Sequence, residues 1–129
     1  MIDNRKARVR VLNKISPIGL ARLPADLYEV GADIDAPDAI LVRSADMHGM
    51  AIPKSVLAIG RAGAGTNNIP VPEMSARGVP VFNAPGANAN AVKELVLAAM
   101  LLAARNLHGA IRFVDELDYS ADDLDERVE

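Results

Sequence analysis

Short apolar runs alternate with polar, glycine-rich and proline-rich segments along the first hundred residues of the chain. Continuous apolar runs are typical of strands that are buried on both faces of a parallel sheet. Such runs predict strands at residues 9–12, 39–42, 55–59 and 79–83. Ser16-Pro17 is a helix start, and residues 71–77 are expected to form a short helix that ends at Gly78. The pattern predicts an α/β fold in which helices flank a parallel sheet.

The longest apolar run, residues 95–104, lies in a helix predicted to begin near residues 88–90 and to close at Gly109. Asn90 is expected to cap this helix, and Glu94 is expected to lie in its first turn. The run is apolar on every face, and such a helix must be buried all round. One sheet covers one side only, so we expect a part of the protein outside these residues to cover the other. The alternative is that the other helices of the domain suffice.

Composition limits the choice of fold and site. The 129 residues are enough for one domain; 50% are hydrophobic and only 3% aromatic, so we expect a core of Ala, Val, Leu and Ile. There is no cysteine, and His48 and His108 lie far apart without paired ligands, so no metal site is expected. The N-terminus lacks an apolar signal segment, and the longest apolar run is too short to span a bilayer. A cytoplasmic protein without a membrane partner is expected.

The formal net charge of −3 hides an asymmetry along the chain. Residues 1–108 hold 12 Lys/Arg and 9 Asp/Glu, a balance of +3, whereas residues 109–129 hold 2 and 8, a balance of −6. The mildly basic part suits a small anionic ligand. It has no basic stripe with interleaved aromatic residues, so no nucleic-acid partner is expected. The acidic end is expected to be a solvated helix or a disordered tail.

A glycine-rich turn, Gly60-Arg61-Ala62-Gly63-Ala64-Gly65, follows one of the predicted strands. Its spacing is G-x-x-G-x-G, two prolines follow it, and the next strand ends in Asn83 and not in an acid. A dinucleotide fingerprint differs on each of these points. Glycines still allow backbone N–H groups to point at a carboxylate or phosphate. The alternative is a tight connection between a strand and a helix.

Two arginines stand at predicted strand ends. Arg43, with Ser44 beside it, directly follows the run at 39–42, and Arg61 lies in the glycine turn. The carboxyl ends of neighbouring parallel strands share one crevice, where ligands bind. A guanidinium can bind a carboxylate or phosphate through two hydrogen bonds. We therefore expect both arginines to face one anion site, to which Asn83 also contributes; the alternative is that they are surface residues.

Four stretches together resemble the D-isomer-specific 2-hydroxyacid dehydrogenases: residues 40–44, 59–69, 81–86 and 88–96. The resemblance holds in order and spacing from about residue 8 to residue 109. It implies a flavodoxin-like sheet, with residues 1–109 as the N-terminal part of a substrate-binding domain. Residues 110–129 would be a tail that leads to an NAD-binding Rossmann domain, which is absent from the 129 residues together with the family's catalytic Arg, Glu and His. No catalytic residue is assigned, because neither histidine of the chain matches.

The resemblance also implies roles for individual residues. Arg43 and Arg61, with Ser44, would bind the phosphate or carboxylate of a phospho-hydroxyacid. Backbone N–H groups at Gly63, Ala64 and Gly65 would hold the substrate carboxylate, with Ala64 close to the nicotinamide of NAD. Asn83 would help to position the substrate, whereas Asn67 stands where many members have Asp, and its role is left open.

These expectations define the predicted function. The parent protein would be an NAD-dependent dehydrogenase, and the chain alone would bind the substrate anion without catalysing the reaction. The alternatives are a hydroxypyruvate, glyoxylate or lactate enzyme of the same family, or a stand-alone anion-binding regulatory module. The apolar helix at 91–107 is expected to pair with a second copy and form a homodimer.

Overall fold

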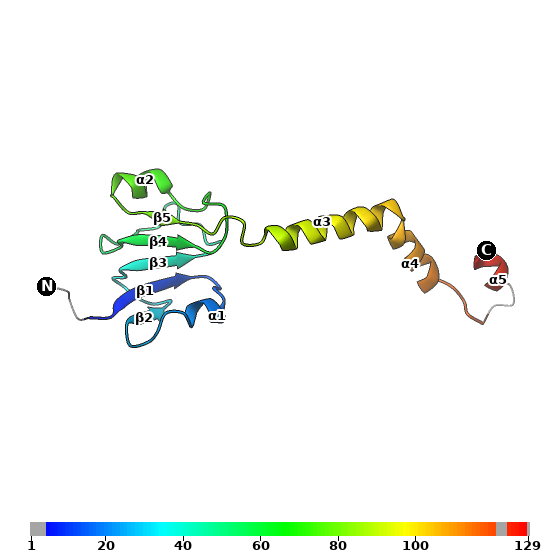
Figure 1. Cartoon of the computed structure of the whole chain (residues 1–129), viewed down its shortest axis with the longest axis horizontal. Helices are drawn as coiled ribbons and strands as arrows, with labels where there is room; N and C mark the ends of the chain where they lie inside the picture. The colour runs from blue at the N-terminus through cyan, green and yellow to red at the C-terminus, as the bar shows by residue number, and fades with distance from the viewer. Residues whose placement is uncertain (1–4, 121–123, 129) are drawn as a thin grey trace. The chain divides into compact units, whose positions relative to one another are not determined.

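The computed structural model describes residues 5–120 and 124–128. It divides into two compact units, Met1–Ala87 and Asn88–Glu129. The first unit carries the sheet, and the second is helical (Figure 1). The boundary between the units lies earlier in the chain than the predicted boundary between residues 109 and 110. The reason is that the long helix belongs to the second unit. The assignment of these parts to a substrate-binding domain and a tail stays a prediction.

Five parallel strands form one sheet in the order β2-β1-β3-β4-β5 (Figure 1). The strands are β1 (Ala7–Leu12), β2 (Tyr28–Gly31), β3 (Ala39–Val42), β4 (Ala58–Arg61) and β5 (Val81–Phe82). This is the strand order of flavodoxin-like folds. The predicted α/β fold with a flavodoxin-like parallel sheet is confirmed.

The observed strands differ from the prediction in several places: β1 begins earlier, at Ala7, and β5 is limited to Val81–Phe82. The short edge strand β2 was not predicted; Glu29 is exposed between the half-buried Tyr28 and Val30, and the strand ends at Gly31. The strand predicted at 55–59 forms three residues later, as β4. A turn occupies the start of that run, since the Val56 N–H donates to the Pro53 carbonyl at 3.2 Å.

The main buried cluster lies on one face of the sheet, whereas Val9 of β1 is buried on the other face. The register pairs Ile40 of β3 with Ile59 of β4, and both side chains are buried. The buried cluster consists of Ile40, Val42, Met47, Val56, Ile59, Ile69, Met74 and Val79. The prediction that leucine and alanine help to form the core is wrong for this cluster. Leu12 and Ala45 are only partly buried and pack against it. Methionine fills the space in their place, as a flexible side chain can.

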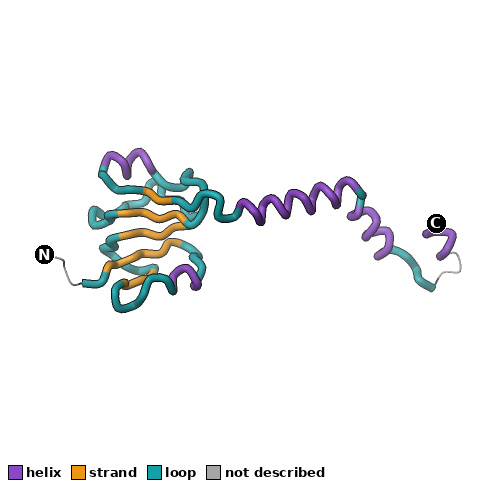
Figure 2. Tube along the Cα trace, viewed as in Figure 1, coloured by secondary structure: helices purple, strands orange, loops and turns teal. Residues whose placement is uncertain are grey.

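Two short helices belong to this unit (Figure 2): α1 (Pro17–Leu20), which begins after Ser16 as predicted, and α2 (Val71–Ala76). Helix α2 contributes Met74 to the core. It ends as predicted at Gly78, which has a positive φ of 70°. The Gly78 N–H donates to Ser75 at 3.0 Å and the Val79 N–H to Met74 at 2.9 Å, which is the Schellman pattern.

The second unit contains α3 (Ala89–Ala104), α4 (Leu107–Asp115) and α5 (Leu124–Val128). The prediction of a single helix that closes at Gly109 is wrong. The chain bends by 65° between α3 and α4, and Asn106 lies in the left-handed region at φ 47°. Gly109 lies inside α4. The acidic end is thus helical in part, while residues 121–123 and 129 lie outside the described residues.

Helix α3 begins within the predicted range, but its capping differs from the prediction. Asn88, and not Asn90, is the N-cap residue, and the first turn contains no acidic residue. Asn90 instead donates from its side-chain amide to Glu94 at 2.7 Å. No residue of α3 is buried, and Leu95 is 71% exposed. Within the described ranges no single helix is long and apolar enough to cross a membrane, whereas the bent pair α3 and α4 meets that test by length and composition alone.

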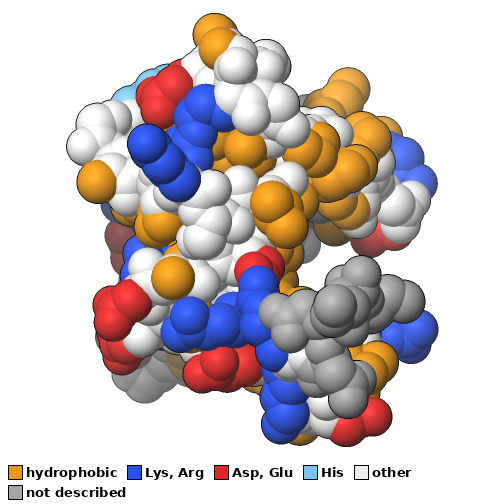
Figure 3. Space-filling view, turned by 90° about the vertical axis from the view of Figure 1, so that its left-hand side faces the viewer, with side chains coloured by type: hydrophobic (Ala, Val, Ile, Leu, Met, Phe, Trp, Pro, Cys, Tyr) orange, Lys and Arg blue, Asp and Glu red, His pale blue; other side chains and the backbone are white. Residues whose placement is uncertain are grey.

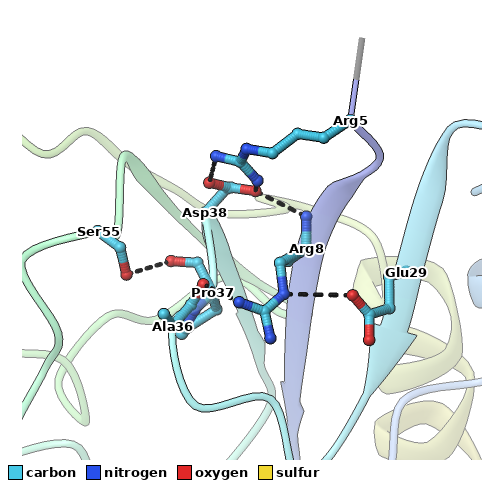
Figure 4. Close-up of polar contacts among 7 residues, drawn as sticks. All are labelled: Arg5, Arg8, Glu29, Ala36, Pro37, Asp38 and Ser55. Atoms are coloured by element: carbon cyan, nitrogen blue, oxygen red, sulfur yellow. Dashed lines mark hydrogen bonds and ion pairs between the residues drawn. The ribbon is translucent and has the colours of Figure 1, made fainter. Parts of the chain in front are cut away.

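Paired charges hold the ends of the sheet where the strands begin (Figure 4). The Arg5 guanidinium donates two hydrogen bonds of 2.7 Å to the Asp38 carboxylate, which also accepts the Arg8 N–H at 2.8 Å. The hydrogen bond from Arg5, followed by that from Arg8, lowers the pKa of Asp38 from 3.8 to about 2. Figure 3 views this end and shows Lys and Arg side chains next to Asp and Glu side chains.

Candidate anion site at the carboxyl ends of the strands

All strands run in the same direction, so the loops that follow them lie at one edge of the sheet (Figure 1). Arg43 and Ser44 follow β3, Arg61 is the last residue of β4, and Asn83 follows β5. The register pairs Val42 with Arg61, which places Arg43 one residue beyond the end of that pairing. The residues predicted for the site therefore come from neighbouring strands.

Arg43 and Ser44 line a hollow of about 290 Å³ together with Asn13 and Lys14, which follow β1. The Asn13 side-chain amide donates to the Ser44 hydroxyl at 2.8 Å, and its oxygen accepts the Arg43 N–H at 3.3 Å. The four residues that line this hollow include two cations and no carboxylate. Asn13 and Lys14 were missed by the sequence reasoning, although they directly follow the first predicted strand and so reach the same edge.

Arg61 lies at a second hollow, of about 190 Å³. Its lining consists of Ile15, Leu41, Gly60, Arg61, Ala62, Phe82 and Asn83. The two arginines thus line separate hollows at the same edge of the sheet, and their shared anion site stays a prediction. The reason for the separation is local: the Arg61 side chain folds over its own loop, where a Cβ built on Gly63 would collide with the guanidinium.

Gly63 is required by this packing and by its backbone, which has a φ of 153°. The Arg61 Nε is buried and has no hydrogen-bond partner among the described residues. Buried donors in proteins are nearly always satisfied. Arg61 therefore keeps a donor that the described residues leave unused, next to a mostly apolar hollow.

The glycine turn is tied to the ends of β3 and β5. The Ala62 N–H donates to the Val42 carbonyl at 2.8 Å, and the Asn83 side-chain amide donates to the Ala64 carbonyl at 2.6 Å. Asn83 thus holds the loop in position. In the described part of the chain, the N–H groups of Ala64 and Gly65 donate to no protein acceptor. Two such consecutive donors can bind a carboxylate oxygen.

Three further hydrogen bonds join the loop after β3 to the loop after β4. The Met47 N–H donates to the Asn68 carbonyl at 2.9 Å, and the Asn68 side-chain amide donates to the Ala45 carbonyl at 2.7 Å. The His48 Nε2 lies 3.1 Å from the Asn67 carbonyl oxygen. His48 and Asn68 thus fix the loops that carry the candidate anion-binding groups. No local sequence pattern predicts these hydrogen bonds, because they depend on how β3 and β4 pair.

A nicotinamide dinucleotide does not fit the described residues alone. Its pyrophosphate needs a glycine loop that opens directly into a helix N-terminus. Here the space above Gly63 holds the Arg61 guanidinium, and α2 starts only after Pro70, without a side-chain cap. The edge is instead suited to a small molecule with two anionic groups, one at the cationic hollow and one at the glycine turn.

Comparisons with known proteins agree with this architecture. Residues 8–123 match the family described as D-isomer specific 2-hydroxyacid dehydrogenase, catalytic domain. The chain is 38% identical over 91 residues to a D-3-phosphoglycerate dehydrogenase of Archaeoglobus fulgidus, covering 68% of this chain and 17% of that protein. It is 36% identical over 116 residues to the enzyme of that name from Mycobacterium tuberculosis, covering 79% and 22%. The chain therefore spans about a fifth of the length of these relatives.

A solved structure extends the comparison. An NADPH-dependent glyoxylate/hydroxypyruvate reductase from Sinorhizobium meliloti, in complex with NADP and malonate, superimposes with a TM-score of 0.64 at 25% identity. The superposition covers 87% of this chain and 40% of the reductase. The resemblance drawn from the four sequence stretches is confirmed at the level of the family.

Proposed function

Because the chain belongs to the D-isomer specific 2-hydroxyacid dehydrogenase family, we propose that it is the substrate-binding part of a D-3-phosphoglycerate dehydrogenase. This enzyme would oxidise 3-phosphoglycerate to 3-phosphohydroxypyruvate, the first step of serine biosynthesis. The observation that carries the proposal is the hollow lined by Arg43, Ser44 and Lys14 at the edge that also holds the glycine turn. A substrate with a phosphate and a carboxylate would use both.

The proposed roles follow from the contacts. Arg43 and the Ser44 hydroxyl would bind the phosphate, and the N–H groups of Ala64 and Gly65 would hold the carboxylate. Asn83 would keep the turn in place through its bond to the Ala64 carbonyl. Members of the family use NAD(P), which accepts the hydride. The position of Ala64 near the nicotinamide stays a prediction from the resemblance.

The chain alone is proposed to bind the substrate without oxidising it. Hydride transfer needs a bound nicotinamide and a general base that takes the hydroxyl proton. His48 lies against the Asn67 carbonyl, and the lining of the two hollows at this edge contains no histidine or carboxylate. We expect no NADH from the purified 129-residue chain with 3-phosphoglycerate and NAD. Measurable NADH would contradict this part of the proposal.

Calorimetric titration of the chain with 3-phosphoglycerate, D-lactate and hydroxypyruvate tests the substrate. The proposal expects the phosphorylated compound to bind most tightly. Preference for hydroxypyruvate would favour the second candidate, a glyoxylate/hydroxypyruvate enzyme, which the structural likeness to the Sinorhizobium meliloti reductase supports. Binding of inorganic phosphate without discrimination among hydroxyacids would favour a stand-alone anion-binding module.

We also propose that the chain forms a homodimer through α3. Leu95, Leu97 and Leu101 are 71%, 51% and 65% exposed, and burying such side chains is worth on the order of 3–6 kcal/mol in total. Light scattering should therefore detect a dimer, and Leu101→Glu should convert it to a monomer. Ile18→Glu in α1, at a residue that is 83% exposed, is the matched control and should leave the dimer intact. A monomeric wild-type chain at micromolar concentration would overturn this proposal.

A further inference from the structure

The hollow beside Arg43 lies where the sheet topology changes direction. From β1 the chain passes to β2 on one side, and then returns to β3 on the other side of β1. In open parallel sheets, ligands bind outside the carboxyl ends of the strands at such a switch point. Asn13 and Lys14 follow β1, and Arg43 and Ser44 follow β3, so the hollow joins the two strand ends that form the switch point.

We propose that Lys14 and Asn13, which line this switch-point hollow beside the proposed phosphate-binding residues, make the site selective for phosphorylated hydroxyacids. The inference rests on the proposed function and deepens it. A phosphate monoester carries a charge between about −1.5 and −2 at neutral pH, whereas a carboxylate carries one negative charge. Two cations, Lys14 and Arg43, line the hollow, which matches the charge of the phosphate.

Asn13 prepares the site for an acceptor ligand. Its φ of 54° is left-handed, a conformation that asparagine tolerates, and its side chain bonds to Arg43 and Ser44 at the end of β3. The Arg43 N–H can only donate, so the Asn13 oxygen must face it, and the amide nitrogen must face Ser44. The Ser44 oxygen therefore accepts a hydrogen bond from Asn13. Its own proton is left to donate to a ligand oxygen.

Lys14→Gln tests the selectivity. We expect the affinity of the 129-residue chain for 3-phosphoglycerate and for inorganic phosphate to fall about fivefold to tenfold. The affinity for D-glycerate, which lacks the phosphate, should change less than twofold. Lys54→Gln removes the same charge from a different hollow, which also contains Arg77, and should leave all three affinities unchanged. Equal losses in both variants, or unchanged binding in Lys14→Gln, would overturn the inference.

The pH profile separates a direct contact from a structural effect. The second ionisation of a phosphate monoester has a pKa near 6, so the phosphate titrates between pH 5 and 7. The wild-type affinity for 3-phosphoglycerate should rise across this range because two cations prefer the dianion. In Lys14→Gln the rise should be smaller. A parallel loss at every pH would indicate that Lys14 acts only on the structure, and would contradict the proposal.

Asn13→Asp tests the hydroxyl. The new carboxylate would accept the Ser44 proton and bring a negative charge to the hollow, so the affinity for phosphate should fall at least about tenfold. Asn13→Gly keeps the left-handed backbone, and its loss should be smaller. Circular dichroism checks that both variants fold. Unchanged phosphate affinity in folded Asn13→Asp would refute the assigned role.

The outcomes distinguish this inference from the proposed function. If inorganic phosphate binds in a manner that depends on Lys14, but neither 3-phosphoglycerate nor D-glycerate binds, the hollow is a phosphate site and the proposed function fails. If 3-phosphoglycerate binds equally well to the wild-type chain and to Lys14→Gln, the proposed function stands and the inference fails. If neither phosphate nor 3-phosphoglycerate binds, both fail.

Discussion

The two ends of the sheet use their cations differently. Where the strands begin, Arg5 is paired with Asp38, and Arg77 donates to the Pro53 carbonyl at 2.8 Å (Figure 4 shows the first pair). Where the strands end, Lys14 and Arg43 line a hollow whose described lining has no carboxylate. Both ends contain several basic residues, so the number of cations does not distinguish a structural end from a ligand-binding end. The partner of each cation makes this distinction.

The largest effect that this comparison predicts is on ligand binding. Arg43→Ala should weaken 3-phosphoglycerate binding by about 2–3 kcal/mol, roughly 30- to 150-fold, since a charged partner of the ligand is lost. The melting temperature should hardly change, because the side chain is exposed and alanine keeps the N–H that donates to Asn13. Calorimetric titration and thermal melts measure both. Full affinity in the variant would make Arg43 an ordinary surface residue.

The strands that could be predicted from the sequence are those that appear as continuous apolar runs. Residues 39–42 form a continuous apolar run because β3 lies between β1 and β4. The edge strand β2 has only one neighbour, and the exposed Glu29 breaks its apolar character. Helix α3 was predicted to continue to Gly109, because no apolar pattern marks the left-handed turn at Asn106.

The site shows the same limit. Strand ends can be located in the sequence, and this placed Arg43, Arg61 and Asn83 at one edge. The contact between Asn13 and Ser44 joins residues 31 positions apart and exists only because β1 and β3 are neighbours. Strand order is a global property that apolar runs do not encode. The packing of Arg61 onto Gly63 depends on a side-chain conformation, which the sequence does not encode locally either.

At the other end of the sheet, substitution should affect stability and not binding. Asp38→Asn should lower the free energy of unfolding by about 1–2 kcal/mol at pH 7, because the carboxylate accepts three hydrogen bonds and its side chain is only 14% exposed. Solvent screens the attraction between the two charges, because Arg5 is half exposed, and this limits the loss of stability. Urea unfolding measures the change, with Asp26→Asn at an exposed position as the control. If Asp38→Asn lost phosphate binding but kept its stability, the end of the sheet where the strands begin would be the ligand-binding end, and the comparison would be wrong.

The contribution of Asp38 should also depend on pH. Its pKa is about 2 in the folded protein and 3.8 ordinarily, so the folded state binds the proton less readily than the unfolded chain. The stabilisation is present above pH 3.8 and is lost as the pH falls toward 2. The difference in stability between wild type and Asp38→Asn should therefore shrink between pH 5 and pH 2. A difference that stays constant in urea unfolding over this range would exclude the charge of Asp38 as its source.

The smallest effect is expected at the neighbouring pair of Arg8 and Glu29. Their 3.2 Å contact is exposed, with 34% of the Arg8 side chain and 56% of the Glu29 side chain accessible. Glu29→Gln keeps an oxygen that can accept the Arg8 hydrogen bond, and Arg8 still donates to the Ala36 carbonyl at 3.1 Å. Only the charge is removed, so the stability should change by less than about 0.5 kcal/mol, and by nothing measurable in 1 M salt. Urea unfolding at low and high salt measures the change in the free energy of unfolding. A loss comparable to that of Asp38→Asn would mean that exposure does not govern the strength of ion pairs where the strands begin.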